Sequence, residues 1–394
     1  MVQKKRLGEI ALLQRGLTYN KGDEVPSSSK IVLRSNNIDL ESHSLDLSEL
    51  KYLREDFVIP DDRKVKKDSI IICMSNGSKQ HVGKVAFIDR NMDYAFGGFM
   101  GLIIPKHSIS AKYVFYACNS SSYRTFLSQI GNGIGITNLR FSELEKFEIP
   151  VPSIEKQQSI VNELDLLTGI IDKKNAQLSD LDALAQSIFY EMFGDLMVSE
   201  KWPRHIIKDL CIVNPSKKLI PSNLQANDTV SFLPMEDLEI KAGYAEPKQT
   251  RLLSEVQGSY TFFAEDDVLL AKVTPCFENG KVGIASNLRN GIGFGSSEFF
   301  VIRPIKGIVK EVIYFLAQTQ HFISEASKQL TGTSGLRRVP RSFIEILSIA
   351  IPPMGLQEAF AERIKVIEKE KITIKQSIQS AQMLLDSRMD AYFG

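Results

Sequence analysis

Cysteine, histidine and tryptophan are scarce in this sequence. Its 394 residues include four cysteines, five histidines and one tryptophan. Cys73, Cys118, Cys211 and Cys276 lie far apart without a CxxC pair. Their spacing argues against a zinc finger and a disulfide framework and suits a reducing compartment. The histidines are isolated and no HExxH motif occurs, so the sequence predicts no metal site.

Long apolar runs are also absent. No segment approaches the roughly 20 apolar residues that a membrane-spanning helix needs. The basic start at residues 1–6 is not followed by the apolar stretch of a signal peptide. The hydrophobic content of 43% and the charged content of 24% are those of ordinary globular domains. We therefore expect a soluble protein of the cytoplasm.

Motifs required by common nucleotide-binding and methyl-transferring enzymes are incomplete. A phosphate-binding GxxxxGK[ST] loop fails between Gly77 and Lys84, because the spacing is one residue too long and Val85 replaces Ser or Thr. Asn214-Pro215-Ser216 lacks the second proline and the aromatic residue of DNA amino-methyltransferases. We expect the chain to have no catalytic residues, to bind no cofactor or metal, and to catalyse no reaction.

What the sequence does contain is an internal repeat with an offset of 200 residues. Gln157 recurs as Gln357, and Phe193-Gly194 recurs as Phe393-Gly394. Further pairs at or near this offset are Pro152 and Pro352, Ser142 and Ser342, Gly135 and Gly335, Gly83-Lys84-Val85 and Gly280-Lys281-Val282, and Phe96-Gly97 and Phe294-Gly295. The period is far too long for one repeat of a solenoid, so each copy predicts a complete domain with a tail.

Each copy begins with a β-rich region. Apolar runs bounded by Gly, Pro, Asn or Asp predict buried strands. These runs cover 70–74, 85–88 and 102–104 in the first copy, and 268–271, 282–284 and 299–302 in the second. A helix is expected next, over 110–128 and 309–329. A glycine-rich loop at 131–135 and 331–335 and a short strand near 149–152 and 351–353 then complete each copy.

Each copy ends in a long helix, predicted over 154–193 and 354–393. Apolar residues recur there at alternating steps of three and four. Those expected to pair the two helices are Leu164, Leu167, Ile171, Leu178, Leu181, Ile188, Ile364, Ile367, Ile374, Ile378 and Leu385. Such a seam over about four heptads is typical of a coiled coil, with a helix packed on its own domain as the alternative. Lys174 and Lys371 interrupt it, and we expect their charged heads to reach water.

Polar loops between the predicted strands offer contacts to nucleic acid. Residues 1–150 and 201–350 each carry a slight excess of Lys and Arg, whereas 151–200 are acidic. Arg and Lys can pair with guanine, and Asn or Gln with adenine, while other basic groups hold phosphates. The candidates for DNA binding are Arg34, Asn36, Asn37, Asn76, Ser78, Lys79, Gln80, Asn138, Arg140, Thr274, Asn279, Lys281, Ser296, Ser297, Arg337 and Arg338. The alternative for each is an ordinary exposed loop group. These loops differ between copies that otherwise match, which favours two recognition domains with different contacts.

The whole arrangement resembles the specificity subunit of type I restriction–modification enzymes. The resemblance rests on the Pro-to-Gln entry into each long helix, at 152–157 and 352–357, and on the Phe-Gly helix ends. It also rests on a strand-like opening at 7–10 with a counterpart at 202–210. In the second copy Gly355-Leu356 replaces Glu155-Lys156, while the proline and the glutamine remain.

The resemblance implies an α+β fold with two tandem β-rich target recognition domains, at 1–152 and 197–352. Each would be followed by a spacer helix, at 153–196 and 353–394, and the two helices would form an antiparallel coiled coil. Each domain would recognise one half of a split site in double-stranded DNA. The implied partners are two DNA methyltransferase (modification) subunits, which carry S-adenosylmethionine, and two restriction subunits, with ATP and Mg also expected in partner subunits. No membrane partner is implied.

Three other interpretations stay open from the residues. The same architecture can serve a type IIB-like system. A stand-alone methyltransferase would bind S-adenosylmethionine as a purified chain. A coiled-coil scaffold unrelated to DNA would show no salt-dependent binding to random duplex.

Overall fold

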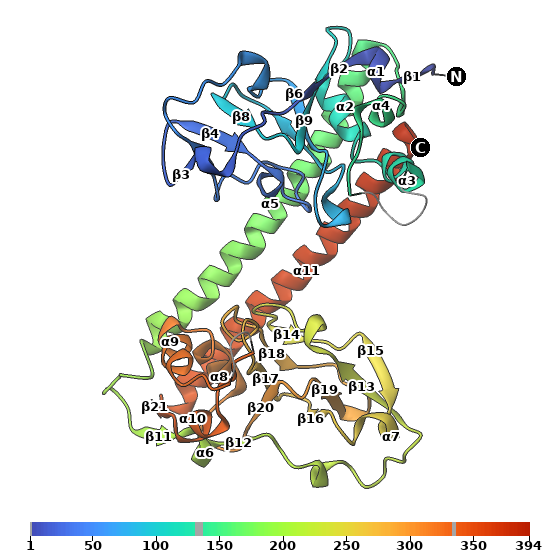
Figure 1. The fold of residues 1–394 in the computed structure, drawn as a ribbon. Helices are drawn as coiled ribbons and strands as arrows, with labels where there is room; N and C mark the ends of the chain where they lie inside the picture. Colours follow the sequence, from blue (N-terminus) through green and yellow to red (C-terminus); the bar gives the residue numbers. More distant parts are fainter. Residues whose placement is uncertain (1, 131–136, 333–335) are drawn as a thin grey trace. The chain divides into compact units, whose positions relative to one another are not determined.

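The computed structural model describes residues 2–130, 137–332 and 336–394. The chain forms two compact units (Figure 1). Unit 1 comprises Met1–Lys174 and Ser377–Gly394, and unit 2 comprises Asn175–Gln376. Each unit therefore takes one β-rich region and a part of both long helices. No helix in the described ranges is long and apolar enough to cross a membrane.

Unit 1 is built on two four-stranded sheets. One has the order β2 (Ala11–Arg15), β9 (Met100–Pro105), β6 (Ser69–Cys73), β7 (Val85–Ile88), with antiparallel neighbours throughout. The other has the order β3 (Glu24–Val25), β5 (Lys51–Leu53), β4 (Lys30–Leu33), β8 (Tyr94–Phe96), and β4 runs parallel to β8. A separate pair joins β1 (Lys4–Arg6) to β10 (Glu148–Pro150). The strands predicted at 70–74, 85–88 and 102–104 are confirmed.

The central strand β6 is buried on both faces, which explains its continuous apolar sequence. Ile70 and Ile72 belong to a core cluster with Tyr113. Ile71 belongs to a second cluster with Leu33. Because successive side chains of a strand point to opposite faces, both faces of β6 need apolar residues.

Unit 2 repeats this plan. Its larger sheet has the order β12 (Cys211–Val213), β20 (Phe299–Pro304), β17 (Val268–Ala271), β18 (Val282–Ala285), β14 (Tyr244–Ala245). Its second sheet has the order β15 (Gln249–Leu252), β13 (Thr229–Leu233), β19 (Ile292–Gly295), β16 (Thr261–Ala264) (Figure 1). β13 runs parallel to β19, as β4 does to β8. A separate pair joins β11 (Arg204–Ile206) to β21 (Ser348–Ala350). The strands predicted at 268–271, 282–284 and 299–302 are confirmed, as is the internal duplication.

The single helix predicted after each set of strands is wrong. Unit 1 has α2 (Ala111–Ala117) and α3 (Ser121–Ile130), and unit 2 has α8 (Lys310–Leu316) and α9 (Gln320–Lys328). A hydroxyl side chain starts the second helix in both units. Ser120 Oγ accepts a hydrogen bond from the N–H of Tyr123, and Thr319 Oγ1 accepts one from Phe322. Such N-caps satisfy free backbone donors of a new helix.

The strand-like opening predicted at residues 7–10 is also wrong, because α1 (Leu7–Ile10) is one helical turn. Leu7 and Ile10 are both buried, and a spacing of three residues places both on the inner face of a turn. The carboxylate of Glu9 accepts a hydrogen bond from the N–H of Arg6 at 2.6 Å. Unit 2 repeats the turn as α6 (Ile207–Leu210) after β11.

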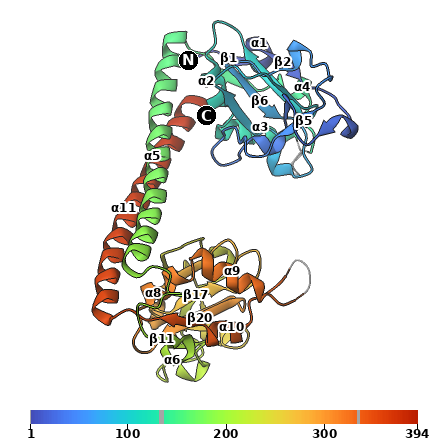
Figure 2. The ribbon, with the colours of Figure 1, turned by 90° about the vertical axis from the view of Figure 1, so that its left-hand side faces the viewer.

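The long helices have the predicted bounds, α5 (Ile154–Phe193) and α11 (Met354–Phe393). In unit 1 the end of α11 lies beside the beginning of α5 (Figure 2), where Arg388 Nε and Glu163 Oε1 are 2.9 Å apart. In unit 2, Lys371 Nζ lies 2.7 Å from Asp182 Oδ1. The other short helices are α4 (Phe141–Leu144) in unit 1 and α7 (Leu253–Val256) and α10 (Arg341–Ile346) in unit 2.

Candidate nucleic-acid interface

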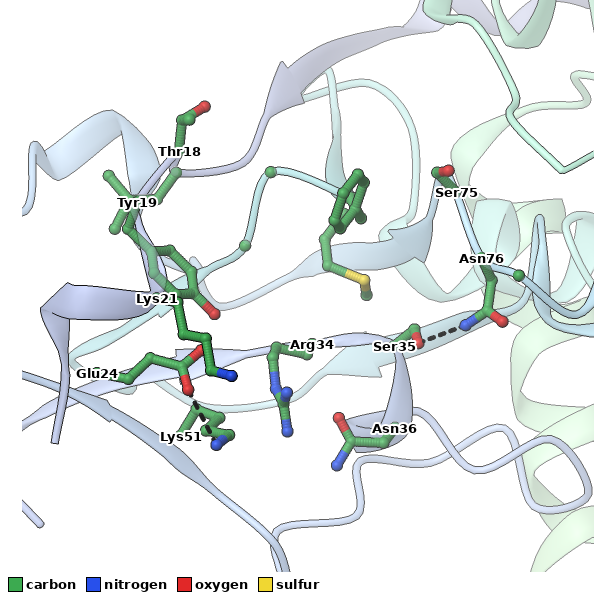
Figure 3. A pocket seen from close by; sticks show the side chains of 16 residues that line it. Thr18, Tyr19, Lys21, Glu24, Arg34, Ser35, Asn36, Lys51, Ser75 and Asn76 are labelled. Carbon is green, nitrogen blue, oxygen red and sulfur yellow. Dashed lines mark hydrogen bonds and ion pairs between the residues drawn. The ribbon is translucent and has the colours of Figure 1, made fainter. Parts of the chain in front are cut away.

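In unit 1 the carboxyl ends of several strands meet at one edge. β2 and β6 both pair antiparallel with β9, so they run in the same direction. The segments after β2, β4, β6 and β8 line a hollow of about 850 Å³ (Figure 3). Its hydrogen-bonding lining includes Tyr19, Lys21, Arg34, Asn36, Lys51 and Asn76. Function often resides on such loops, because the buried strands beneath hold them in place.

The first hollow is mainly cationic. Lys51 Nζ lies 3.0 Å from Glu24 Oε2, and this contact lowers the pKa of Glu24. Lys21 and Arg34 line the same space. The Nε atom of Arg34 is buried and has no hydrogen-bond partner in the described parts of the chain. A guanidinium with an unpaired N–H group can donate a hydrogen bond to an acceptor atom of a ligand.

The amide of Asn76 is held at the edge of this hollow. Its Nδ2 donates to Ser35 Oγ at 2.6 Å, and its Oδ1 accepts from the N–H of Ser78 at 2.8 Å (Figure 3 draws the first bond). These bonds orient the side chain and leave one N–H and one oxygen lone pair for a further partner. An adenine edge offers such a donor–acceptor pair.

A second hollow of about 730 Å³ adjoins the first. The two share Ser75, Asn76, Gly77, Gly98 and Phe99 among their lining residues. The second adds the predicted Asn138 and Arg140 and also Arg15 and Phe141. The shared Phe99 is 73% exposed, so its ring is open to a ligand at the junction of the two hollows.

The structure brings five of the predicted unit 1 residues together. They are Arg34, Asn36, Asn76, Asn138 and Arg140. Ser78, Lys79 and Gln80 are exposed in the segment around a short 3-10 turn and line neither hollow. The glycine-rich loops predicted at 131–135 and 331–335 lie wholly or mainly outside the described residues.

Asn37, another candidate for DNA binding, lies inside the unit. Its side chain is 1% exposed. Its Nδ2 donates to the carbonyls of Asp46 and Glu49, and its Oδ1 accepts from the N–H of Arg34. These bonds use the amide to fasten the turn that carries Arg34, and a contact of Asn37 with DNA stays a prediction.

Two candidates of unit 2 also make hydrogen bonds inside their unit. Lys281 Nζ donates to the carbonyl of Met235 at 2.9 Å, as Lys84 does to Ile38 at 2.6 Å in unit 1. Thr274 is 7% exposed, and its hydroxyl accepts a hydrogen bond from a backbone N–H. The polar atoms of both residues thus make contacts inside the unit, and their contacts with DNA stay a prediction.

The remaining unit 2 candidates lie nearer the surface. Asn279, Ser297 and Arg337 are exposed, and Ser296 is half-buried. Arg338 is half-buried and is held by Glu298, with Nε to Oε2 and Nη2 to Oε1 both 2.9 Å. Arg338 lowers the pKa of Glu298, so both groups are charged at neutral pH.

Sequence reasoning missed several residues that line the unit 1 hollows. Arg15 ends β2 and Lys51 begins β5, while Tyr19, Lys21 and Phe99 stand between short strands. β3 and β5 have only two and three residues, so no alternating pattern marked the loops beside them. The available signal was Gly97-Gly98 before Phe99, because a Gly-Gly pair marks a turn or loop.

The residues predicted to pair the long helices are all at least half-buried. Leu164, Leu167, Ile364, Ile367 and Ile374 are buried. Ile171, Leu178, Leu181, Ile188, Ile378 and Leu385 are half-buried.

The expectation that the head of Lys371 reaches water is wrong. Lys371 is 5% exposed, and its Nζ lies 2.7 Å from Asp182 and 2.8 Å from Glu368. The ammonium group of Lys371 therefore pairs with two carboxylates, whereas the sequence pattern led us to expect it to be solvated. Lys174 is half-buried. Among the described side chains, no group of three or more His, Cys, Asp or Glu is placed to hold a metal ion.

Comparisons with known proteins agree with this architecture. The chain is 34% identical over 155 residues to the type I restriction enzyme EcoEI specificity subunit of Escherichia coli, an alignment that spans 39% of this chain and 25% of that protein. It is 23% identical over 405 residues to the StySPI specificity subunit of Salmonella potsdam, spanning 96% of this chain and 84% of that protein. The chain thus spans about a quarter of the first relative and most of the second.

A solved structure, the type I restriction–modification system S subunit from M. genitalium, shares the fold. It has a TM-score of 0.54 and 14% identity, and the alignment covers 100% of this chain and 96% of that chain. A family model described as the type I restriction modification DNA specificity domain matches residues 1–181 and again 199–381. Because these two matches cover most of the sequence, this chain belongs to the family of type I restriction–modification DNA specificity domains.

Proposed function

We propose that this chain is the DNA-recognising specificity subunit of a restriction–modification complex. The observation that carries the proposal is the edge of unit 1, where cationic and amide side chains line two adjoining hollows. Family membership supplies the context for that edge. Each unit recognises one half of a bipartite sequence in double-stranded DNA.

The side chains at the edge fall into two chemical classes. Lys21, Lys51 and Arg140 are cations suited to phosphates, which fix the position of a protein on DNA without reading sequence. Asn76 and Asn138 are amides, which can pair with a base edge in the major groove. An interface with both classes binds DNA in general and still discriminates between sequences.

We infer that α5 and α11 pair along their length as an antiparallel coiled coil. Support comes from contacts inside the units. In unit 2 Asp182 of α5 meets Lys371 of α11, while Phe189, further along α5, meets Phe360, earlier in α11. Residues later in α5 thus contact residues earlier in α11, as expected for two antiparallel helices. The proposed division is therefore 1–152 and 197–352 for recognition and 153–196 and 353–394 for spacing.

The partners follow from the same proposal. The paired helices dock two methyltransferase subunits, which carry S-adenosylmethionine, and restriction subunits with ATP and Mg join the same complex. The chain itself catalyses no reaction, in keeping with relatives named as specificity subunits. A type IIB-like complex is the second candidate, because it would use the same recognition units.

The decisive experiment maps methylated adenines. The chain is expressed with its modification subunits in a host that lacks adenine methylation, and the host genome is sequenced for modified bases. We expect methylation at one bipartite motif that disappears when this chain is left out. Methylation that is independent of the chain, or that has no motif, would refute the proposal.

A replacement of one unit tests the division of labour. Residues 1–150 are exchanged for those of another family member with a known motif. We expect one half of the methylated motif to change and the other half to stay the same. A change in both halves would contradict independent recognition.

A further inference from the structure

The turn between β8 and β9 in unit 1 is built like the turn between β19 and β20 in unit 2. The N–H of Gly97 donates to the carbonyl of Leu33 at 2.8 Å. The N–H of Ser296 donates to the carbonyl of Leu233 at 3.3 Å. Gly97 and Ser296 therefore hold equivalent positions on the same backbone framework.

Two residues further on, Phe99 corresponds to Glu298. The carbonyl of Phe99 accepts from the N–H of Met74 at 2.8 Å. The carbonyl of Glu298 accepts from the N–H of Lys272 at 2.9 Å. The backbone is matched at this position, whereas the side chain is an exposed aromatic ring in one unit and a carboxylate in the other.

The adjacent segment supplies a second matched position. Asn138 forms a β-bridge with Ser75, and Arg338 forms one with Val273. These segments lie beside the turns, since the unit 1 hollow is lined by both Phe99 and Asn138, and Arg338 bonds directly to Glu298. The matched pair is thus Phe99 with Asn138 in unit 1 and Glu298 with Arg338 in unit 2.

In unit 2 the pair presents a fixed guanidinium. Glu298 accepts from Nε and Nη2 of Arg338, and the carbonyl of Leu336 accepts from Nη1 at 3.3 Å. Since each terminal nitrogen carries two hydrogens, one N–H on Nη1 and one on Nη2 are left for a ligand. Guanine offers two adjacent acceptors, O6 and N7, that match such a fork.

In unit 1 the pair presents an amide beside an apolar ring. The side chain of Asn138 is exposed, and Phe99 is 73% exposed. An asparagine amide can pair with N6 and N7 of adenine, and a phenylalanine ring can contact the methyl group of thymine. Both features belong to one A·T base pair.

We propose that these matched positions select one base pair in each half-site. Phe99 with Asn138 selects an A·T pair, and Arg338, positioned by Glu298, selects a guanine. The inference rests on the proposed function and adds the chemistry that each unit recognises. Glu298 acts as a positioning residue through Arg338.

The unit 2 test uses the assembled methyltransferase complex with Glu298→Gln and, separately, Arg338→Ala. We expect the methylation motif to relax at one guanine of one half-site, with a loss of preference of about 5- to 150-fold, the worth of one bidentate base contact. The matched control is Glu345→Gln, which removes another carboxylate paired with an arginine of unit 2, at 2.8 Å. It should leave the motif intact.

The unit 1 test uses Phe99→Ala and Asn138→Ala, with Val58→Ala as the control at a side chain that is 82% exposed. We expect relaxation at one A·T position of the other half-site. A transplanted pair, Phe99→Glu with Asn138→Arg, should replace that A·T position by a guanine. Thermal unfolding identifies variants that do not fold. If the double variant does not fold, the single substitutions Phe99→Ala and Asn138→Ala test the inference for unit 1.

The outcomes separate this inference from the proposed function. A wild-type complex without a sequence motif would overturn the proposed function. A wild-type motif that stays unchanged in the Glu298→Gln, Arg338→Ala, Phe99→Ala and Asn138→Ala variants would overturn the inference alone. Relaxation that spreads over many positions, or that equally affects the controls, would also overturn it, because it would indicate a general loss of structure or affinity.

Discussion

Gln157 Oε1 accepts a hydrogen bond from the backbone N–H of Ser110 at 2.9 Å. Gln357 Oε1 accepts one from the N–H of Val309 at 3.0 Å in the other unit. Ser110 and Val309 are the N-cap residues of α2 and α8. Each glutamine thus fastens the first turn of a long helix to a short helix of its own unit, which explains the repeated Pro-to-Gln motif physically.

Replacing Gln357 by Glu should destabilise unit 2. Its Nε2 donates to the carbonyls of Pro352 at 2.8 Å and Gly307 at 3.0 Å, and the residue is 0% exposed. An ionised carboxylate cannot donate to these oxygens, so we expect a loss of about 1–3 kcal/mol or more. Thermal and urea unfolding at neutral pH measure it. The control is Gln158→Glu, at an exposed position of α5; an equal effect there would contradict the explanation.

Glu311 should weaken unit 2 at neutral pH. It is 6% exposed, and burial raises the pKa of its carboxyl. The folded state then binds the proton more tightly than the unfolded state, so stability falls as pH rises from the unfolded to the folded pKa. Glu311→Gln should therefore raise the melting temperature at pH 7 by a few degrees. The gain over wild type should vanish below the ordinary pKa of glutamate.

The control for this pH dependence is Glu358→Gln, at an exposed position of α11. It should leave both the melting temperature and its pH profile close to wild type. A gain from Glu311→Gln that persists unchanged at low pH would show that the carboxyl charge is not its cause.

Lys371 should be needed for the stability of unit 2. Burial lowers the pKa of its amine, but Glu368 and Asp182 raise it more, and the net shift is upward. Lys371→Met leaves Glu368, which is 7% exposed, without its partner. Removing one member of a buried pair costs about 3–5 kcal/mol. Adding Glu368→Gln to the variant should recover most of the loss.

The matched control is Lys365→Met on the same helix. Lys365 Nζ lies 3.9 Å from Glu362, and both side chains are largely exposed. Exposed pairs contribute about 0–1 kcal/mol. A similar loss from Lys365→Met and Lys371→Met in denaturant unfolding would contradict a special role for the buried pair.

The strands and the long helices were predictable because each has a strong pattern. β6 is a run of five residues buried on both faces, and α5 and α11 carry apolar residues at steps of three and four. The break between α2 and α3 was not predictable, because the apolar pattern does not show that Ser120 caps a new helix. The sequence match of Phe96-Gly97 with Phe294-Gly295 is one residue out of register. In the sheets Phe96 pairs with Leu33, and the residue at the same place in unit 2 is Gly295, which pairs with Leu233.

The sequence predicted the kinds of side chain at the candidate site better than it predicted which residues line it. Residue types pointed to Arg34, Asn76, Asn138 and Arg140, which do line the two hollows. The same reasoning also selected Asn37, whose amide binds three backbone groups. In the sequence, such an asparagine cannot be distinguished from one whose amide faces solvent. Only tertiary contacts separate the two cases.

The length of the paired helices should set the gap between the two half-sites of the proposed target. A helix rises about 1.5 Å per residue, so one added heptad lengthens it by roughly 10.5 Å. That distance corresponds to about three base pairs of DNA, at about 3.4 Å each. A heptad keeps the apolar seam in register, whereas one or two extra residues rotate it away from its partner.

Because the two helices are antiparallel partners in this proposal, the insertion must be made in both. We expect a chain with residues 178–184 and 368–374 each duplicated, two segments that face each other through Asp182 and Lys371, to methylate a motif with a longer unspecified spacer and unchanged half-sites. Its affinity should fall somewhat, since the twist of the added base pairs turns the second half-site around the DNA axis. The matched control inserts one residue in each helix, which should disrupt the seam and abolish methylation. An active heptad variant that keeps the original spacer would show that something other than α5 and α11 measures the gap.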